Sequence, residues 1–322
     1  MRILYLCDKH QYDTKMSRVR FQSIEAISKV SDLKYSGKNW NNYDNTKSVQ
    51  DNIDRIYGKE QPDIVVAYKP LDLVDFKSIK PVKCMRYNEM WNNRWTTSEI
   101  VKSGSELVIC HHLNDMPNYK HLSEVKFVNI SHCAEQTIYK DYGLPKINDV
   151  LLTGAISRHY PFRARLRNIM LKELAGKVKC KVLNHPGGDL RNVHGAILDG
   201  YAKEMNQSKI TLTCSSAYKY RLGKYTEIPM SGSLLAADLP NEDQDFFKQF
   251  MLVLNPQDSD EVIAKQILEY VNDDDKRNEL IQKGIELNKE YTQEKYAERF
   301  VDVCNSYGRW LWAKKHPGII CD

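Results

Sequence analysis

Short apolar segments alternate with amphipathic segments through the first half of the chain. Strand-like runs rich in β-branched residues occupy residues 2–7, 63–67, 82–87, 106–110 and 125–130. Residues 18–28 and 48–58 lie between such runs and repeat their apolar side chains at helical spacing. Alternation of buried strands with helices is typical of a parallel sheet covered by helices. The first half is therefore predicted to form an α/β domain.

A second series of the same kind follows the sequence Gly143-Leu144-Pro145. Strands are predicted at residues 149–153, 178–183, 209–214, 233–237 and 251–254. Helices are predicted at residues 162–174, 196–207 and 224–230, and then at 258–270, 275–288 and 293–312. The predicted domains are residues 1–146, residues 147–305, and a terminal helix or tail at 306–322 that packs near the first domain.

Composition narrows the class of protein. The chain has 322 residues, of which 42% are hydrophobic, enough for two globular domains. No run approaches the roughly 18 apolar residues of a membrane-spanning helix, and the polar start predicts a cytoplasmic protein. The 8 cysteines are scattered singly, which favours reduced thiols over zinc ligands. The formal net charge of +5, with both signs interleaved, suits a small anionic ligand.

Residues 220–238 carry the most informative chemistry. A glycine turn at Gly223 leads into a short helix with one carboxylate, Glu227, and a second glycine, Gly232, precedes an apolar strand. Open parallel sheets bind ligands beyond the carboxyl ends of their strands. A helix start near Gly223 would offer N–H groups to a phosphate, and Glu227 could accept hydrogen bonds from ribose hydroxyls.

A second glycine turn follows the strand predicted at 149–153. Gly154 leads into a basic loop that contains Arg158 and enters a helix containing Arg163. The two arginines resemble the arginine and lysine that group-1 glycosyltransferases place about five residues apart to hold the donor's diphosphate. The resemblance implies that they would stabilise the negative charge that grows there as the glycosidic bond breaks.

These residues resemble the C-terminal domain of the group-1 (family 4-like) glycosyltransferases. Glu227 and Gly232 keep the five-residue offset of that family's Glu-Ala-Met-Ala-x-Gly stretch, and Lys219 stands where the family usually has another glutamate. The sequence Tyr160-Pro161-Phe162-Arg163 is closest to a spore-maturation-like branch. Three further stretches, at 255–261, 272–277 and 291–296, are similar to the family's closing pattern.

The resemblance implies the GT-B fold, in which two Rossmann-like domains face a cleft, with a C-terminal helix able to cross back to the first domain. It implies a retaining, metal-independent enzyme that transfers a hexose or related sugar and uses no cofactor besides its nucleotide-diphosphate sugar donor. The catalytic residues would be Arg158, Arg163 and Glu227. Further donor contacts are expected at Gly154, Lys219, Arg221, Gly223, Lys224 and Gly232.

Asp258-Ser259-Asp260 matches the Asp-x-Asp motif of metal-dependent glycosyltransferases. It opens a periodic helix, and Asp258 with Glu261 is interpreted as a capping box. No metal site is predicted.

Acceptor contacts are expected from loops that follow the strands of the first half. The candidates are His10, Arg20, Glu89, His111 and His132. The first strand is followed by Asp8-Lys9-His10-Gln11, without the Gly-x-Gly-x-x-Gly of nicotinamide dehydrogenases.

Two other functions fit the same pattern. One is a non-catalytic protein that binds a nucleotide sugar or a glycan, and the other is a sugar-nucleotide epimerase. The sequence leaves open the base and sugar of the donor, the oligomeric state, and whether the acceptor is a glycan, a lipid, a protein or a modified nucleic acid.

Overall fold

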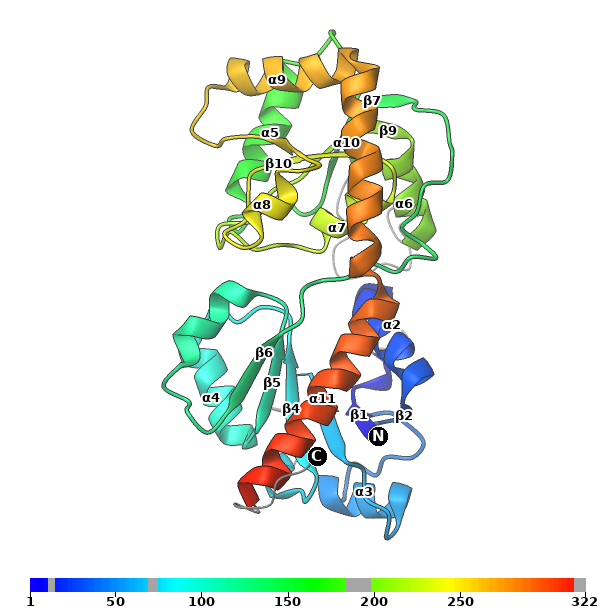
Figure 1. Ribbon diagram of the computed structural model, residues 1–322, viewed down its shortest axis with the longest axis vertical. Helices are drawn as coiled ribbons and strands as arrows, with labels where there is room; N and C mark the ends of the chain where they lie inside the picture. The colour runs from blue at the N-terminus through cyan, green and yellow to red at the C-terminus, as the bar shows by residue number, and fades with distance from the viewer. Residues whose placement is uncertain (11–14, 69–74, 184–197, 316–322) are drawn as a thin grey trace. The chain divides into compact units, whose positions relative to one another are not determined.

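The computed structural model describes residues 1–10, 15–68, 75–183 and 198–315, except for the side chains of 15–21, 198, 309, 310 and 312–315 (Figure 1). Within it the chain forms two compact units. Unit 1 combines Met1–Ser131 with Glu294–Asp322, and unit 2 is the continuous segment His132–Gln293.

Unit 1 is built on a six-stranded parallel sheet in the order β2-β1-β3-β4-β5-β6. The strands are β1 (Arg2–Leu6), β2 (Asp32–Ser36), β3 (Ile64–Ala67), β4 (Val82–Tyr87), β5 (Leu107–Cys110) and β6 (Lys126–Asn129). The connecting helices are α2 (Lys15–Val30), α3 (Val49–Tyr57), η2 (Phe76–Ser78), α4 (Asn93–Ser103) and η3 (Leu113–Tyr119). The central strands β3 and β5 are fully buried, as strands covered on both faces are.

The last helix of the chain, α11 (Gln293–Lys315), lies against the sheet of unit 1 (Figure 1). Its Tyr296 is buried, and the Tyr296 hydroxyl accepts a hydrogen bond of 2.8 Å from Arg86 Nε on β4. Phe300 and Cys304 are also buried. The start of α11 therefore completes the core of unit 1.

Unit 2 contains a five-stranded parallel sheet in the order β11-β10-β9-β7-β8. The strands are β7 (Asn148–Thr153), β8 (Cys180–Leu183), β9 (Ser208–Leu212), β10 (Leu234–Ala237) and β11 (Leu252–Val253). The helices are α5 (Pro161–Lys172), α6 (Leu198–Asn206), α7 (Lys224–Met230), α8 (Gln244–Phe247), α9 (Asp260–Asn272), α10 (Asp274–Leu287) and η4 (Asn288–Tyr291). Helix α10 packs against β10 and α7 (Figure 1).

The predicted α/β class is confirmed, and so are all the predicted strands. Strand β2 was missed because its sequence, Asp32–Ser36, is polar and only its last residue is fully buried. The predicted capping box at Asp258 and Glu261 is wrong. The N-cap of α9 is Ser259, whose side chain accepts a hydrogen bond from the Val262 backbone.

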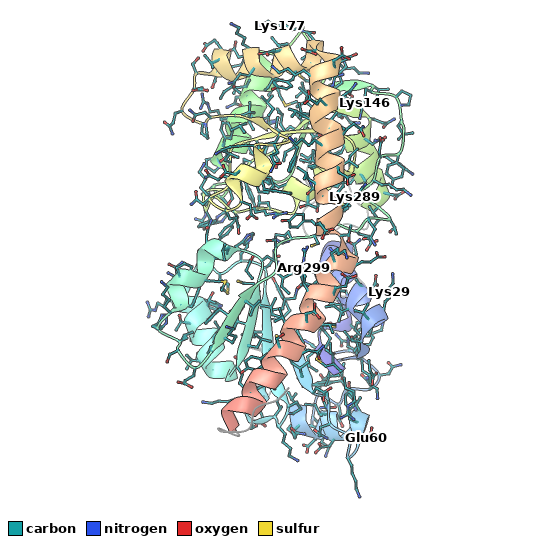
Figure 2. All side chains as sticks on the ribbon, viewed as in Figure 1. Lys29, Glu60, Lys146, Lys177, Lys289 and Arg299 are labelled. Atoms are coloured by element: carbon teal, nitrogen blue, oxygen red, sulfur yellow. The ribbon has the colours of Figure 1, made fainter. Side chains whose placement is uncertain are left out.

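The division into units differs from the sequence-based boundaries after residues 146 and 305. Ala134 and Tyr139 lie in the hydrophobic core of unit 2. Lys146, labelled in Figure 2, donates to the backbone carbonyls of Asn206 and Gly232, so the whole segment 132–146 is attached to unit 2. Among the described residues, no helix is both long and apolar enough to cross a membrane.

Candidate active site

The candidate site lies at the carboxyl edge of the sheet in unit 2, between β7 and β9. These strands are neighbours, but the chain leaves β7 for β8 on one side and returns to β9 on the other. Such a change of direction opens a crevice between the two loops that follow the strands. The loops are joined by a hydrogen bond of 2.8 Å from the Ala217 amide to the His159 carbonyl.

Gly154 directly follows β7, and two cationic side chains lie close to it. A Cβ atom added there would lie 2.7 Å from Arg163 Nη1 and 2.8 Å from Lys224 Cε. Its φ of +97° is also one that residues with side chains rarely adopt. Only glycine therefore lets Arg163, from α5, and Lys224, from α7, approach the end of β7 this closely.

Arg163 is held rigidly at this place. Its side chain is buried, and its Nη1 and Nη2 atoms donate to the Ala155 carbonyl at 2.8 Å and the Thr213 hydroxyl at 3.1 Å. The guanidinium carbon lies 4.2 Å from the centroid of the Tyr160 ring. Arg163 Nε is buried without a hydrogen-bond partner among the described residues.

Lys224 and Glu227 form a loose ion pair on the first turn of α7. Lys224 Nζ lies 3.9 Å from Glu227 Oε2, and their side chains are 21% and 12% exposed. Burial raises the pKa of Glu227 above its ordinary value, and Lys224 offsets part of that increase. Burial lowers the pKa of Lys224, but Tyr201 and Glu227 raise it more, so the net pKa is raised and the ammonium is charged at neutral pH.

The cluster holds more positive than negative charge. Arg163 and Lys224 lie side by side at Gly154, and Glu227 is the carboxylate paired with Lys224. Like charges packed together repel one another, and the attraction of an anion for them is strong in a partly buried site. The arrangement is suited to binding a phosphate or a diphosphate.

Gly223 lies beside Glu227 of this cluster. A Cβ atom added at Gly223 would lie 3.2 Å from Glu227 Oε1, so the glycine gives the carboxylate its space. Arg158 is exposed on the loop between β7 and α5. Of the residues predicted for the donor, the structure thus brings together Gly154, Arg163, Gly223, Lys224 and Glu227.

The other predicted donor residues have different surroundings. Lys219 Nζ forms a 2.6 Å ion pair with the buried carboxylate of Asp238, at the end of β10. Arg221 is fully buried, with its guanidinium carbon 3.8 Å from the Tyr291 ring centroid and Nη1 2.8 Å from Asp243 Oδ2. Gly232 precedes β10 and therefore lies at the opposite edge of the sheet, beside Asp141. The structure thus places Arg221 and Gly232 away from the cluster.

The residues predicted for the acceptor are spread over both units. His111 is buried in unit 1, with Nε2 3.0 Å from Arg86 Nη2 and Nδ1 2.9 Å from the Ile130 carbonyl. Since Arg86 can only donate, Nε2 accepts and Nδ1 carries the proton. His111 is therefore a buried structural group.

His10 is exposed, and its amide donates to Asp8 Oδ1. Glu89 is half-buried after β4, and His132 is half-buried at the start of unit 2. Arg20 lies in α2, and its side chain is outside the described residues.

Two tyrosines of the site were not predicted. Tyr201 on α6 lies near Lys224, and Tyr139 packs against Tyr201 with their rings at 89°. Both come from segments without a motif, and only the tertiary fold brings them to α7. Among the described residues, no group of three or more His, Cys, Asp or Glu side chains could hold a metal ion.

Comparison with solved structures identifies the architecture. Sucrose-phosphate synthase from Thermosynechococcus elongatus superimposes with a TM-score of 0.65 over 98% of this chain and 100% of that one, at 10% identity. Anabaena HepE in complex with UDP and glucose gives a TM-score of 0.58 over 95% of this chain and 100% of that one, at 9% identity. The fold is that of the GT-B glycosyltransferases. No curated protein matches the sequence.

Part of this GT-B chain also matches a family model. Residues 165–302 match the family described as glycosyl transferase-like. The match begins two residues after Arg163 and includes α7, with Lys224 and Glu227. The glycosyl transferase-like region therefore contains the carboxylate and one of the two cations of the cluster.

Proposed function

We propose that the protein is a glycosyltransferase that uses a nucleoside-diphosphate sugar and binds the donor in unit 2. The packing of Arg163 and Lys224 against Gly154, at the edge where the sheet changes direction, carries this proposal. Arg163 and Lys224 bind the diphosphate, and Glu227 accepts hydrogen bonds from the ribose. HepE, which shares the fold, was solved with UDP, and this supports a uridine nucleotide as the first donor to test.

In the proposed reaction an acceptor hydroxyl attacks the anomeric carbon of the sugar. A carbon–oxygen bond forms there while the bond to the diphosphate breaks, and the nucleoside diphosphate leaves with the electron pair. Arg163 and Lys224 stabilise the charge that develops on the leaving group. The leaving phosphate takes the acceptor proton on the face from which it departs, so the sugar keeps its configuration.

The proposal includes a hexose or related sugar and a reaction without a metal, in which these two cations supply the positive charge. A chelator should then leave turnover unchanged. The sequence from Tyr160 to Arg163 supports placing the protein in the spore-maturation-like branch.

The test compares two lysine variants of unit 2 by thermal shift with UDP, GDP, ADP, CDP and TDP. Lys224→Met removes a cation of the cluster, whereas Lys177→Met removes an exposed lysine before β8, at the other edge of the sheet (labelled in Figure 2). A nucleotide at about a hundred times its dissociation constant stabilises the fold by about 2.7 kcal/mol. Loss of a charge-assisted contact of about 1.5–3 kcal/mol should weaken binding in Lys224→Met by about 10- to 100-fold.

We expect one nucleotide to raise the melting temperature of the wild type and of Lys177→Met, and to raise that of Lys224→Met much less. A sugar donor carrying the same nucleotide should then be hydrolysed slowly in water. It should react faster when an acceptor is present. No shift of the wild type with any nucleotide would overturn the donor site. Binding without turnover would favour a non-catalytic nucleotide-sugar protein.

A further inference from the structure

Tyr201 contacts the cationic cluster without belonging to it. It lies on α6, and Lys224 Nζ lies 5.1 Å from the centroid of its ring. An ammonium within about 6 Å of an aromatic ring centroid is attracted by the negative face of the ring. Tyr201 therefore holds Lys224 from the side of α6.

The ring makes a cation–π contact with Lys224, and the Tyr201 hydroxyl also raises the pKa of Lys224. The Tyr201 hydroxyl is buried. The ring is fixed in turn by Tyr139, which meets it edge to face with centroids 6.4 Å apart. Tyr139 is 4% exposed and belongs to the core of unit 2. The position of the Tyr201 ring is thus set by the core.

The charged groups around Lys224 explain why such a contact matters. Glu227 on α7 lies 3.9 Å from Nζ, at the limit of an ion pair, and Arg163 on α5 meets the same side of Gly154 as Lys224. Repulsion from Arg163 and attraction to Glu227 both draw the ammonium toward the carboxylate. The Tyr201 ring provides a separate attraction for the ammonium, from α6.

We propose that Tyr201 is a positioning residue, whose ring keeps the Lys224 ammonium extended beside Gly154, where it meets the phosphates of the donor. The proposal rests on the function proposed above. Tyr201 acts through Lys224 and has no separate contact with the nucleotide. Its effect should therefore disappear when Lys224 carries no charge.

The test is a double-mutant cycle in the full chain, with dissociation constants measured by calorimetry for the nucleoside diphosphate that binds the wild type. Tyr201→Met removes the aromatic face and fills much of the same space, and Tyr201→Phe keeps the face without the hydroxyl. Each is combined with Lys224→Met, and melting temperatures are recorded for every variant. Tyr201→Leu is a second non-aromatic variant if Tyr201→Met does not fold.

We expect Tyr201→Phe to bind within about threefold of the wild type and Tyr201→Met to bind about tenfold more weakly. In the Lys224→Met background, Tyr201→Met should cause no further loss. Wild-type affinity in Tyr201→Met, or the same tenfold loss in both backgrounds, would overturn the positioning role while leaving the donor site intact. A wild type that binds no nucleotide would instead overturn the proposed function, and this inference with it.

Discussion

Gly154 offers the most direct test of the site at the scale of one residue. We expect Gly154→Ala to abolish measurable nucleotide binding, because a Cβ atom would lie within 2.9 Å of both Arg163 and Lys224 and displace them. The left-handed backbone, with φ of +97°, should also cost about 1–2 kcal/mol of stability. Chemical denaturation and nucleotide titration measure the two effects separately.

Gly176→Ala is the matched control. Gly176 also has a positive φ, of +74°, but nothing lies within 4 Å of an added Cβ atom. Its alanine variant should lose stability for the same backbone reason and keep full nucleotide affinity. Equal affinities in the two variants would show that the space at Gly154 is not needed for binding.

Glu227 should make stability depend on pH in a defined direction. Burial raises its pKa above the ordinary value of 4.5, so the folded protein binds this proton more readily than the unfolded chain does. The stabilising contribution of the proton therefore grows as pH falls through the raised pKa and is complete below 4.5. Glu227→Gln does not titrate at this position.

Denaturation of both proteins between pH 7 and pH 4.5 tests this expectation. The free energy of unfolding of the wild type, taken relative to that of Glu227→Gln, should increase as pH falls. A difference that stays constant or decreases would mean that the pKa of Glu227 is not raised in the folded protein.

Local sequence predicted some of these residues better than others. Gly154 directly follows β7, and Arg163 and Glu227 lie in α5 and α7, helices whose preceding glycine turns are visible in the sequence. Arg221 and Gly232 were expected at the donor for their place in the motif. Arg221 is instead buried against aromatic rings, and the direction of β10 places Gly232 at the other edge of the sheet. Both facts depend on tertiary contacts, which the sequence does not display.

Arg221 anchors the loop between β9 and α7, to which it belongs, on neighbouring elements of unit 2. Its guanidinium lies among the rings of Phe246, Phe247 and Tyr291 and pairs with Asp243, which connects the loop to α8 and η4. Arg221→Met should destabilise unit 2 by about 2–4 kcal/mol, because the change removes a fully buried guanidinium from its ring contacts and breaks its ion pair with the partly exposed Asp243. Urea denaturation measures the loss.

Arg221→Lys distinguishes charge from shape. Lysine keeps the charge but cannot stack a planar group on Tyr291. We expect it to recover only part of the stability lost in Arg221→Met. Full recovery would mean that the charge alone holds the loop.

At the scale of helices and strands, the sequence predicted the elements whose own residues define them. Strand β3 is apolar throughout, and α3 and α5 show helical spacing. Strand β2 is polar, and its pairing with β1 along Arg2–Leu6 makes it a strand. Pairing between distant segments is the information that a local pattern lacks.

At the scale of the whole molecule, every residue of the donor cluster lies in unit 2, His132–Gln293. We predict that a fragment of residues 132–293 folds alone and binds the nucleotide as the full chain does. A fragment of residues 147–305 should be much less stable, because it lacks Ala134 and Tyr139 from the core. Thermal unfolding and calorimetry of the two fragments make the comparison.

Two outcomes would contradict this prediction. Equal stability of the fragments would show that segment 132–146 is dispensable to unit 2. A folded 132–293 fragment that does not bind the nucleotide would show that the binding site needs residues of unit 1.

Unit 1 is assembled from two separate stretches of chain, with unit 2 inserted between them as one continuous segment. A ribosome therefore completes all of unit 2 before it adds the helix that carries Tyr296, Phe300 and Cys304. Until then the face of the first sheet that these side chains bury stays uncovered. The order of synthesis thus completes unit 2 before unit 1, whose first stretch lacks part of its core until the last helix has been made.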